Sequence, residues 1–131
     1  MRNIAIIPAR GGSKRIPGKN IKLFNGKPII TYSIKAAIES KLFEKVIVST
    51  DNEEIANISK EYCAKIPFFR SKKNSDDFAT LKDVIEEVIR KLSLHNKFDN
   101  ICILLPTAPL IKKERIIEAY NYLVEKDASS V

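Results

Sequence analysis

Asn3–Pro8, with the sequence NIAIIP, is a continuous apolar run rich in β-branched residues. Such a run is typical of a strand that is covered on both faces in a parallel sheet. Two later runs, at 45–49 and 100–105, have the same character. Between the runs, apolar residues recur with helical spacing, which predicts helices over about 28–40, 55–62, 80–94 and 112–125. Strands that alternate with helices of this length predict an α/β fold, a three-layer sandwich with a mainly parallel sheet.

Local signals add detail at the ends of these elements. Residues 64–68 could form a further short strand. Thr50 and Glu53 have the spacing of a capping box, and Thr80 is a candidate N-cap for the helix that follows it. The last helix is expected to bury five apolar side chains, those of Ile116, Ile117, Tyr120, Leu123 and Val124.

The composition limits the kind of protein. A chain of 131 residues with 44% apolar and 30% charged residues predicts one globular domain and excludes a disordered or low-complexity protein. No apolar run approaches the roughly 18 residues that a membrane span requires. We therefore expect a cytoplasmic protein without a membrane partner.

Cys63 and Cys102 lie in apolar surroundings outside any metal-ligand spacing, which predicts reduced, buried thiols.

The distribution of charge indicates the kind of partner. The formal net charge is +7, and a group of six basic residues without an acidic one accounts for most of it: Arg10, Lys14, Arg15, Lys19, Lys22 and Lys27. The rest of the chain is mixed in sign and has no interleaved aromatic residues for stacking on bases. A small polyanion therefore fits better than a nucleic acid.

The loop after the first strand has the chemistry of a phosphate site. Residues 9–20 read ARGGSKRIPGKN. The paired glycines let backbone N–H groups approach phosphate oxygens, Ser13 adds a hydroxyl donor, and four cations offset negative charge. The loop has neither the Walker spacing nor the dinucleotide-binding spacing of glycines. Because ligands of α/β sheets bind beyond the carboxyl ends of strands, the loop lies where a site is expected.

The residues 7–20, IPARGGSKRIPGKN, resemble the signature of the cytidylyltransferases that activate sialic-acid-type sugars, the CMP-N-acetylneuraminate synthetase family. The resemblance continues in family order through four further segments: 26–30 (GKPII), 48–51 (VSTD), 67–70 (PFFR) and 106–110 (PTAPL). It implies a fold of the nucleotide-diphospho-sugar transferase type. It also implies a homodimer for the family member at full length.

The resemblance implies transfer of CMP from CTP to the anomeric hydroxyl of a nonulosonic acid, with release of pyrophosphate and assistance by Mg²⁺. Arg10 and Lys19 would be catalytic, by stabilising charge on the leaving pyrophosphate. Arg70 would lie near the cytosine, and Asn20 near the nucleotide sugar. The full set that would bind the nucleotide is Ala9, Arg10, Gly11, Gly12, Ser13, Lys14, Lys19, Asn20 and Arg70. Lys14 and Arg15 could instead be solvated charges.

The sugar substrate is indicated by the residues that follow the last predicted strand. Sialic- and legionaminic-type family members usually carry a glutamine where this sequence has Leu105. An apolar residue there resembles enzymes that activate pseudaminic acid, so we favour that sugar, with N-acetylneuraminic acid next. Leu105 and Thr107 are the candidate sugar contacts.

The metal ligands are not assigned by the sequence. Asp76 and Asp77 could bind Mg²⁺, but as residues just before a predicted helix they are also expected to interact with its dipole. Asp51 follows a strand end, and its neighbours favour a capping role over a catalytic one. His95 lies near a helix end and is expected to be a surface residue.

Residues 128–131 (ASSV) follow the last predicted helix, where an α/β chain would begin its next strand. We therefore expect residues 1–131 to form a single nucleotide-binding domain whose C-terminal part is missing, with little or no turnover. The alternative is a non-catalytic nucleotide-binding module, or a fragment that associates through an open sheet edge. A nucleic-acid binder driven by net charge is a third reading.

Overall fold

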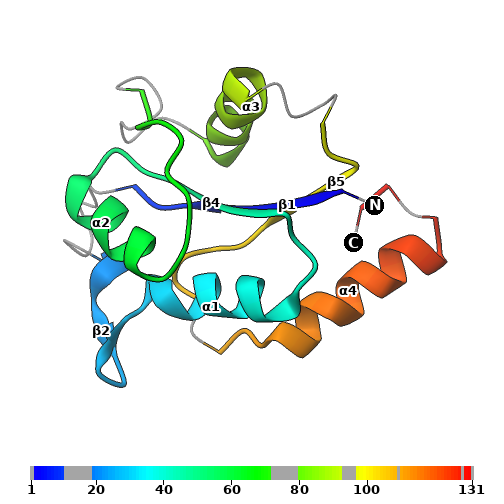
Figure 1. Ribbon diagram of the computed structural model, residues 1–131, viewed down its shortest axis with the longest axis horizontal. Helices are drawn as coiled ribbons and strands as arrows, with labels where there is room; N and C mark the ends of the chain where they lie inside the picture. Colours follow the sequence, from blue (N-terminus) through cyan, green and yellow to red (C-terminus); the bar gives the residue numbers. More distant parts are fainter. Residues whose placement is uncertain are drawn as a thin grey trace.

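A computed structural model of the chain describes residues 2–10, 19–71, 80–92, 97–108, 110–127 and 129–130. A three-stranded parallel sheet, in the order β4-β1-β5, lies between two helical layers (Figure 1). The strands are β1 (Asn3–Pro8), β4 (Lys45–Ser49) and β5 (Asn100–Ile103). Helix α3 (Leu81–Leu92) covers one face, and the opposite face carries α1 (Ile30–Ser40), α2 (Glu53–Glu61) and α4 (Lys113–Glu125). The predicted three-layer α/β architecture is confirmed.

Strand β1 is the centre of the sheet and is buried on both faces. Ala5 and Ile7 pack into the cluster formed with α1, α2 and α4, while Ile4 and Ile6 pack against α3. All four side chains are 0% exposed. This burial on alternate faces explains why the strand is continuously apolar rather than alternating.

Strand β5 differs from the prediction of a buried strand over 100–105. It ends at Ile103, and Ile101 and Ile103 are 37% and 42% exposed. Their partners in the parallel register are Ile4 and Ile6 of β1, so they face the α3 layer. Helix α3 packs over β1 and β4 instead, and β5 is an edge strand in the described sheet.

Helix α4 buries less than its sequence pattern predicts. Ile116 is the one buried residue among the five expected. Ile117, Tyr120 and Leu123 are half-buried, and Val124 is 42% exposed. The helix packs on α1 at the margin of its layer rather than over the middle of the sheet.

Two short β features also differ from expectation. The strand predicted over 64–68 is a single bridge, in which Lys65 N donates to Val46 O at 2.8 Å and Lys65 O accepts from Val48 N at 3.0 Å. A hairpin of β2 (Leu23–Phe24) and β3 (Lys27–Pro28) was not predicted. Its turn residues, Asn25 and Gly26, have φ of 50° and 83°, and an Asn-Gly pair is a strong hairpin signal in sequence.

The helix caps confirm one prediction and correct another. Thr80 Oγ1 accepts from Asp83 N at 3.1 Å, and Thr80 N donates to Asp83 Oδ2 at 3.0 Å, so Thr80 caps α3 as predicted. The N-cap of α2 is Asn52, whose Oδ1 accepts from Ile55 N at 3.0 Å. The capping box expected from Thr50 and Glu53 is wrong, because the Thr50 hydroxyl accepts from Asn52 N instead.

The prediction of two buried thiols is correct in part. Cys102 is half-buried, and burial raises its pKa. Cys63 is exposed, at a turn residue with φ of 74°. Both are free cysteines.

Within the described ranges, we find no helix with the length and apolar character of a membrane span.

The Asn52 cap leads to a stability prediction. Asn52→Ala removes the acceptor for Ile55 N and is expected to lower the free energy of unfolding by about 1 kcal/mol. Asn52→Asp keeps an oxygen at the same place and is the matched control. Urea unfolding followed by circular dichroism measures both. An equal loss in the two variants would show that the cap does not depend on the side-chain oxygen.

Candidate functional site

The carboxyl ends of the three parallel strands form one edge of the sheet, at the left of Figure 1 beside the β2 hairpin. Backbone hydrogen bonds continue past the strand ends. Ala9 N donates to Ser49 O at 2.8 Å, and Arg70 N donates to Thr50 O at 2.7 Å. The Ser33 hydroxyl of α1 donates to Leu105 O at 2.7 Å. These bonds fix the backbone around the edge and hold the side chains that it carries.

Arg10 and Lys19 flank the predicted phosphate loop, and Asn20 joins its two ends. The Asn20 amide donates to Arg10 O at 2.7 Å from a side chain that is 2% exposed. Its buried Oδ1 has no hydrogen-bond partner among the described residues. Lys19 is exposed at the start of the 3₁₀ helix Lys19–Ile21. Arg10 and the Lys19 backbone are thus held near each other at the carboxyl edge.

Arg70 places a buried cation at the same edge. Its side chain is 8% exposed, and its Nη2 donates to Ser49 O at 3.0 Å. Burial lowers the pKa of the guanidinium, Asp51 and Glu87 oppose that shift, and Arg10 adds to it. These charged groups therefore lie close enough to act on one another. A buried cation is tolerated only where neighbouring acceptors and anions compensate for its lost hydration.

Glu87 is the site residue that sequence reasoning missed. It lies on α3, is 3% exposed, and its Oε1 accepts from Ser71 N at 3.2 Å. The hydrogen bond ties α3 to the segment that carries Arg70. Glu87 is three positions after buried Val84, but exposed Lys91 has the same spacing from buried Val88, so the spacing alone does not signal the burial of Glu87.

The structure places the other predicted residues as follows. Gly11, Gly12, Ser13 and Lys14, with Arg15, lie outside the described residues, as do Asp76, Asp77 and His95. Ala9 is fully buried, and its N–H already donates to Ser49 O. Leu105 is 56% exposed and Thr107 is exposed, so both side chains are accessible beyond β5. Asp51 is exposed beyond β4 and acts on Arg70.

A metal centre made by protein side chains alone is not found in the described part of the chain. Nowhere in it do three or more His, Cys, Asp or Glu residues come together as ligands. The edge instead carries the cations Arg10, Lys19 and Arg70, which outnumber the carboxylates Asp51 and Glu87 beside Arg70. This chemistry suits an anionic ligand.

The position of Glu87 generates a second stability prediction. Glu87→Gln keeps an acceptor for Ser71 N but removes an anion beside buried Arg70, so the free energy of unfolding should fall by about 2 kcal/mol. Glu86→Gln is the control, because Glu86 is an exposed neighbour on α3 that pairs with Lys82 at 3.8 Å. Its loss should be about 0.5 kcal/mol or less. Chemical denaturation measures both, and equal losses would contradict an electrostatic role for Glu87.

Comparison with known proteins agrees with this chemistry. The cytidylyltransferase family model matches residues 4–131. The chain is 46% identical over 129 residues to the pseudaminic acid cytidylyltransferase of Campylobacter jejuni, covering 98% of this chain and 56% of that protein. It is 44% identical over 124 residues to the CMP-N,N'-diacetyllegionaminic acid synthase of Legionella pneumophila, covering 91% of this chain and 52% of that protein. The chain thus spans about half the length of the curated relatives it matches.

A solved structure shares the fold. CMP:2-keto-3-deoxy-manno-octonic acid synthetase, determined in complex with CTP, matches with a TM-score of 0.81 and 23% identity, covering 98% of this chain and 49% of that one. The family model matches nearly the whole sequence, and the structure has the parallel sheet with cations at its carboxyl edge. Both observations assign the chain to the same protein family. The chain belongs to the cytidylyltransferase family.

Proposed function

We propose that this chain forms the CTP-binding part of an enzyme that transfers CMP from CTP to the anomeric hydroxyl of a sialic-acid-like nonulosonic acid and releases pyrophosphate. One observation carries the proposal: Arg10, Lys19 and Arg70 come from separate segments and are brought to the carboxyl edge of one sheet. The names of the relatives support the same chemistry.

Arg10 and Lys19 would act on the triphosphate. In the transfer, the anomeric hydroxyl attacks the α-phosphorus in line, and negative charge develops on the oxygen that leaves with pyrophosphate. Cations fixed next to that oxygen lower the barrier, because they stabilise the transition state more than the ground state. The Asn20 bond to Arg10 O holds both ends of the loop in place before CTP binds. Gly11, Gly12, Ser13 and Lys14 would supply further phosphate contacts.

Arg70 would serve the cytosine end of the nucleotide. Its guanidinium is oriented by the bond to Ser49 O, and cytosine offers acceptor atoms to such a donor. Because Arg70 is buried and fixed, it suits selection of a base better than attraction of a mobile phosphate. Asn20 would lie near the nucleotide sugar.

Pseudaminic acid is the sugar we favour, with N-acetylneuraminic acid next. Leu105 presents an apolar side chain, 56% exposed, two residues beyond the end of β5. Thr107, two residues later, would be a second sugar contact. The 46% identity to a pseudaminic acid cytidylyltransferase supports this preference.

The proposal also includes Mg²⁺, a homodimer and a cytoplasmic location. Mg²⁺ usually binds through one or two carboxylates together with substrate phosphates, so it does not require a cage of protein ligands. In the described residues no such cage is found, and we assign no metal ligand and derive no catalytic step through the ion.

A non-catalytic nucleotide-binding module is the second candidate. The exposed side chains of Ile101 and Ile103 on edge strand β5, with exposed Leu105 two residues beyond it, favour a fragment that associates through that edge. Sedimentation velocity tests this alternative. Self-association that is abolished by Ile103→Lys would support association through the edge, and a monomer at all concentrations would argue against it.

Nucleotide binding tests the main proposal. Isothermal titration of this chain with CTP and Mg²⁺ should show binding that ATP and UTP do not reproduce. Arg10→Ala and Lys19→Ala should each weaken CTP binding by at least about tenfold, because each removes a charge-assisted contact to phosphate. Lys27→Ala removes the same charge from the exposed β3 and should leave the affinity within about twofold. Equal effects of all three substitutions would refute a specific triphosphate site.

Sugar selection is tested by Leu105→Gln. With CTP present, the substitution should shift the ratio of sugar affinities toward N-acetylneuraminic acid by about threefold to tenfold, because a glutamine adds one hydrogen-bonding group. Saturation-transfer NMR with pseudaminic and N-acetylneuraminic acids measures the ratio. Leu110→Gln is the matched control, since Leu110 is 81% exposed and lies beyond the proposed contacts. An unchanged ratio in Leu105→Gln would remove Leu105 from the proposed sugar site.

A further inference from the structure

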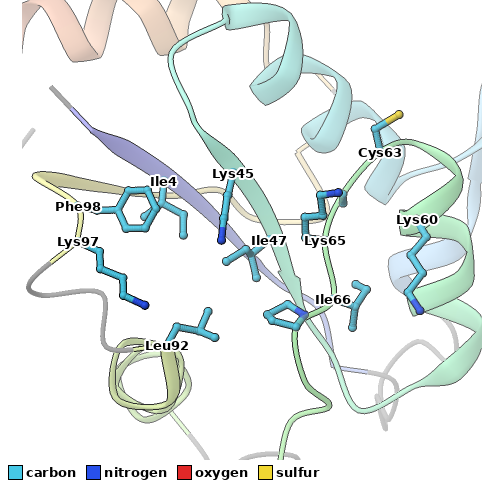
Figure 2. Close-up of a pocket in the computed structure, with 12 residues that line it drawn as sticks. Ile4, Lys45, Ile47, Lys60, Cys63, Lys65, Ile66, Leu92, Lys97 and Phe98 are labelled. Atoms are coloured by element: carbon cyan, nitrogen blue, oxygen red, sulfur yellow. The ribbon is translucent and has the colours of Figure 1, made fainter.

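A cavity of about 760 Å³ lies on the α3 face of the sheet, and it extends from the amino ends of β1 and β4 to the segment in which Lys65 pairs with Ile47 in the middle of β4 (Figure 2). Ile4, the second residue of β1, and Lys45, the first residue of β4, line it. Its other walls come from the end of α3, from α2 and from residues 63–67. The candidate nucleotide site lies past the carboxyl ends of the same strands. The cavity therefore requires a separate explanation.

Four lysines from four parts of the chain line this cavity: Lys45, Lys60, Lys65 and Lys97. No Asp or Glu is among the described residues that line it. Within the described ranges, none of the four lysines forms an ion pair or a hydrogen bond through its ammonium group. Glu44 is next to Lys45 in sequence, and its carboxylate is bound chiefly by Arg2 at 3.0 Å, with Lys45 contributing less to the lowering of its pKa.

The surface between the lysines is apolar. Ile66, Leu92 and Phe98 are half-buried in the lining, and Ile4 and Ile47 lie behind them in the core. Figure 2 shows Lys97 extending toward Leu92 and Lys45 extending toward Ile47. The Cys63 sulfur points away from Ile66, so the thiol is not directed into the cavity.

This arrangement favours a particular class of ligand. Like charges around an apolar surface repel one another, and an anion placed between them relieves the repulsion. The volume is in the range of small-molecule sites, which combine apolar walls with a few charged groups. A solvated lysine face would not require half-buried aliphatic and aromatic side chains between the ammonium groups.

We propose that the cavity binds a small amphipathic organic anion. Its phosphate or carboxylate group would face the lysines, and its apolar body would lie against Ile66, Leu92 and Phe98. The ligand class follows from charge complementarity and from the size of the cavity. The site is independent of CTP, because it is lined by none of the residues assigned to the nucleotide.

Decyl phosphate, used below its micelle concentration, tests this site by isothermal titration calorimetry on the whole chain. It should bind with one-to-one stoichiometry, and saturating CTP with Mg²⁺ should not displace it. The double variant Lys45→Gln, Lys97→Gln should weaken binding by about tenfold, as expected for the loss of two partly exposed ion pairs. The double variant Lys112→Gln, Lys113→Gln removes the same charge at the start of α4 and should change the affinity by less than about twofold.

Two ligand controls test the apolar part without altering the protein. Butyl phosphate should bind more weakly than decyl phosphate, because it covers less apolar surface. Decyltrimethylammonium, with the same chain and the opposite charge, should not bind. Equal affinities for the anionic and cationic ligands, equal losses in the two double variants, or displacement by CTP would each overturn the proposal. Failure of CTP to bind would contradict the proposed nucleotide site and leave this one standing.

Discussion

The burial of β1 between two helical layers is the constraint on which the other features depend. Ala5 and Ile7 pack toward α1, α2 and α4, and Ile4 and Ile6 pack toward α3. Both edges of β1 are paired, with β4 on one side and β5 on the other. Because both faces and both edges of the strand are covered, only the residues past its two ends can reach solvent. The loop that follows Pro8 therefore emerges at the carboxyl edge of the sheet, where the neighbouring strands also end.

The carboxyl edge combines cations with groups that compensate for their burial. Arg70 is almost fully buried, yet it bonds to Ser49 O and lies near Asp51 and Glu87. These partners stabilise a guanidinium that would otherwise be costly to remove from water. Arg10 has the opposite effect on Arg70, because it brings a second positive charge close to the first. Such paired cations are easier to accommodate once an anion binds between them, which is what a triphosphate would supply.

Sequence reasoning predicts the features that depend on local pattern. The enclosed strand Asn3–Pro8 and the Thr80 cap follow from runs and spacings within a few residues, and the structure confirms both. The exposure of Ile101 depends instead on which strand α3 covers, and a single sequence does not contain that information. The contact of Glu87 with Ser71 joins residues 16 positions apart, so Glu87 could not be predicted from local spacing, whereas the resemblance points to Arg10, Lys19, Asn20 and Arg70. The Asn25-Gly26 turn, by contrast, is a feature that local sequence does signal.

The basic residues behind the net charge of +7 are distributed differently in the folded structure than along the sequence. In the sequence, the basic residues gather between Arg10 and Lys27, and the remainder is mixed in sign. Folding places four lysines from positions 45–97 around one cavity on the α3 face of the sheet, without a carboxylate among the described lining residues. Arg70, at the carboxyl end, has Asp51 and Glu87 beside it. At the lysine cavity, Glu44 acts on Lys45 but is itself bound by Arg2, so an anion bound between the lysines would relieve their mutual repulsion.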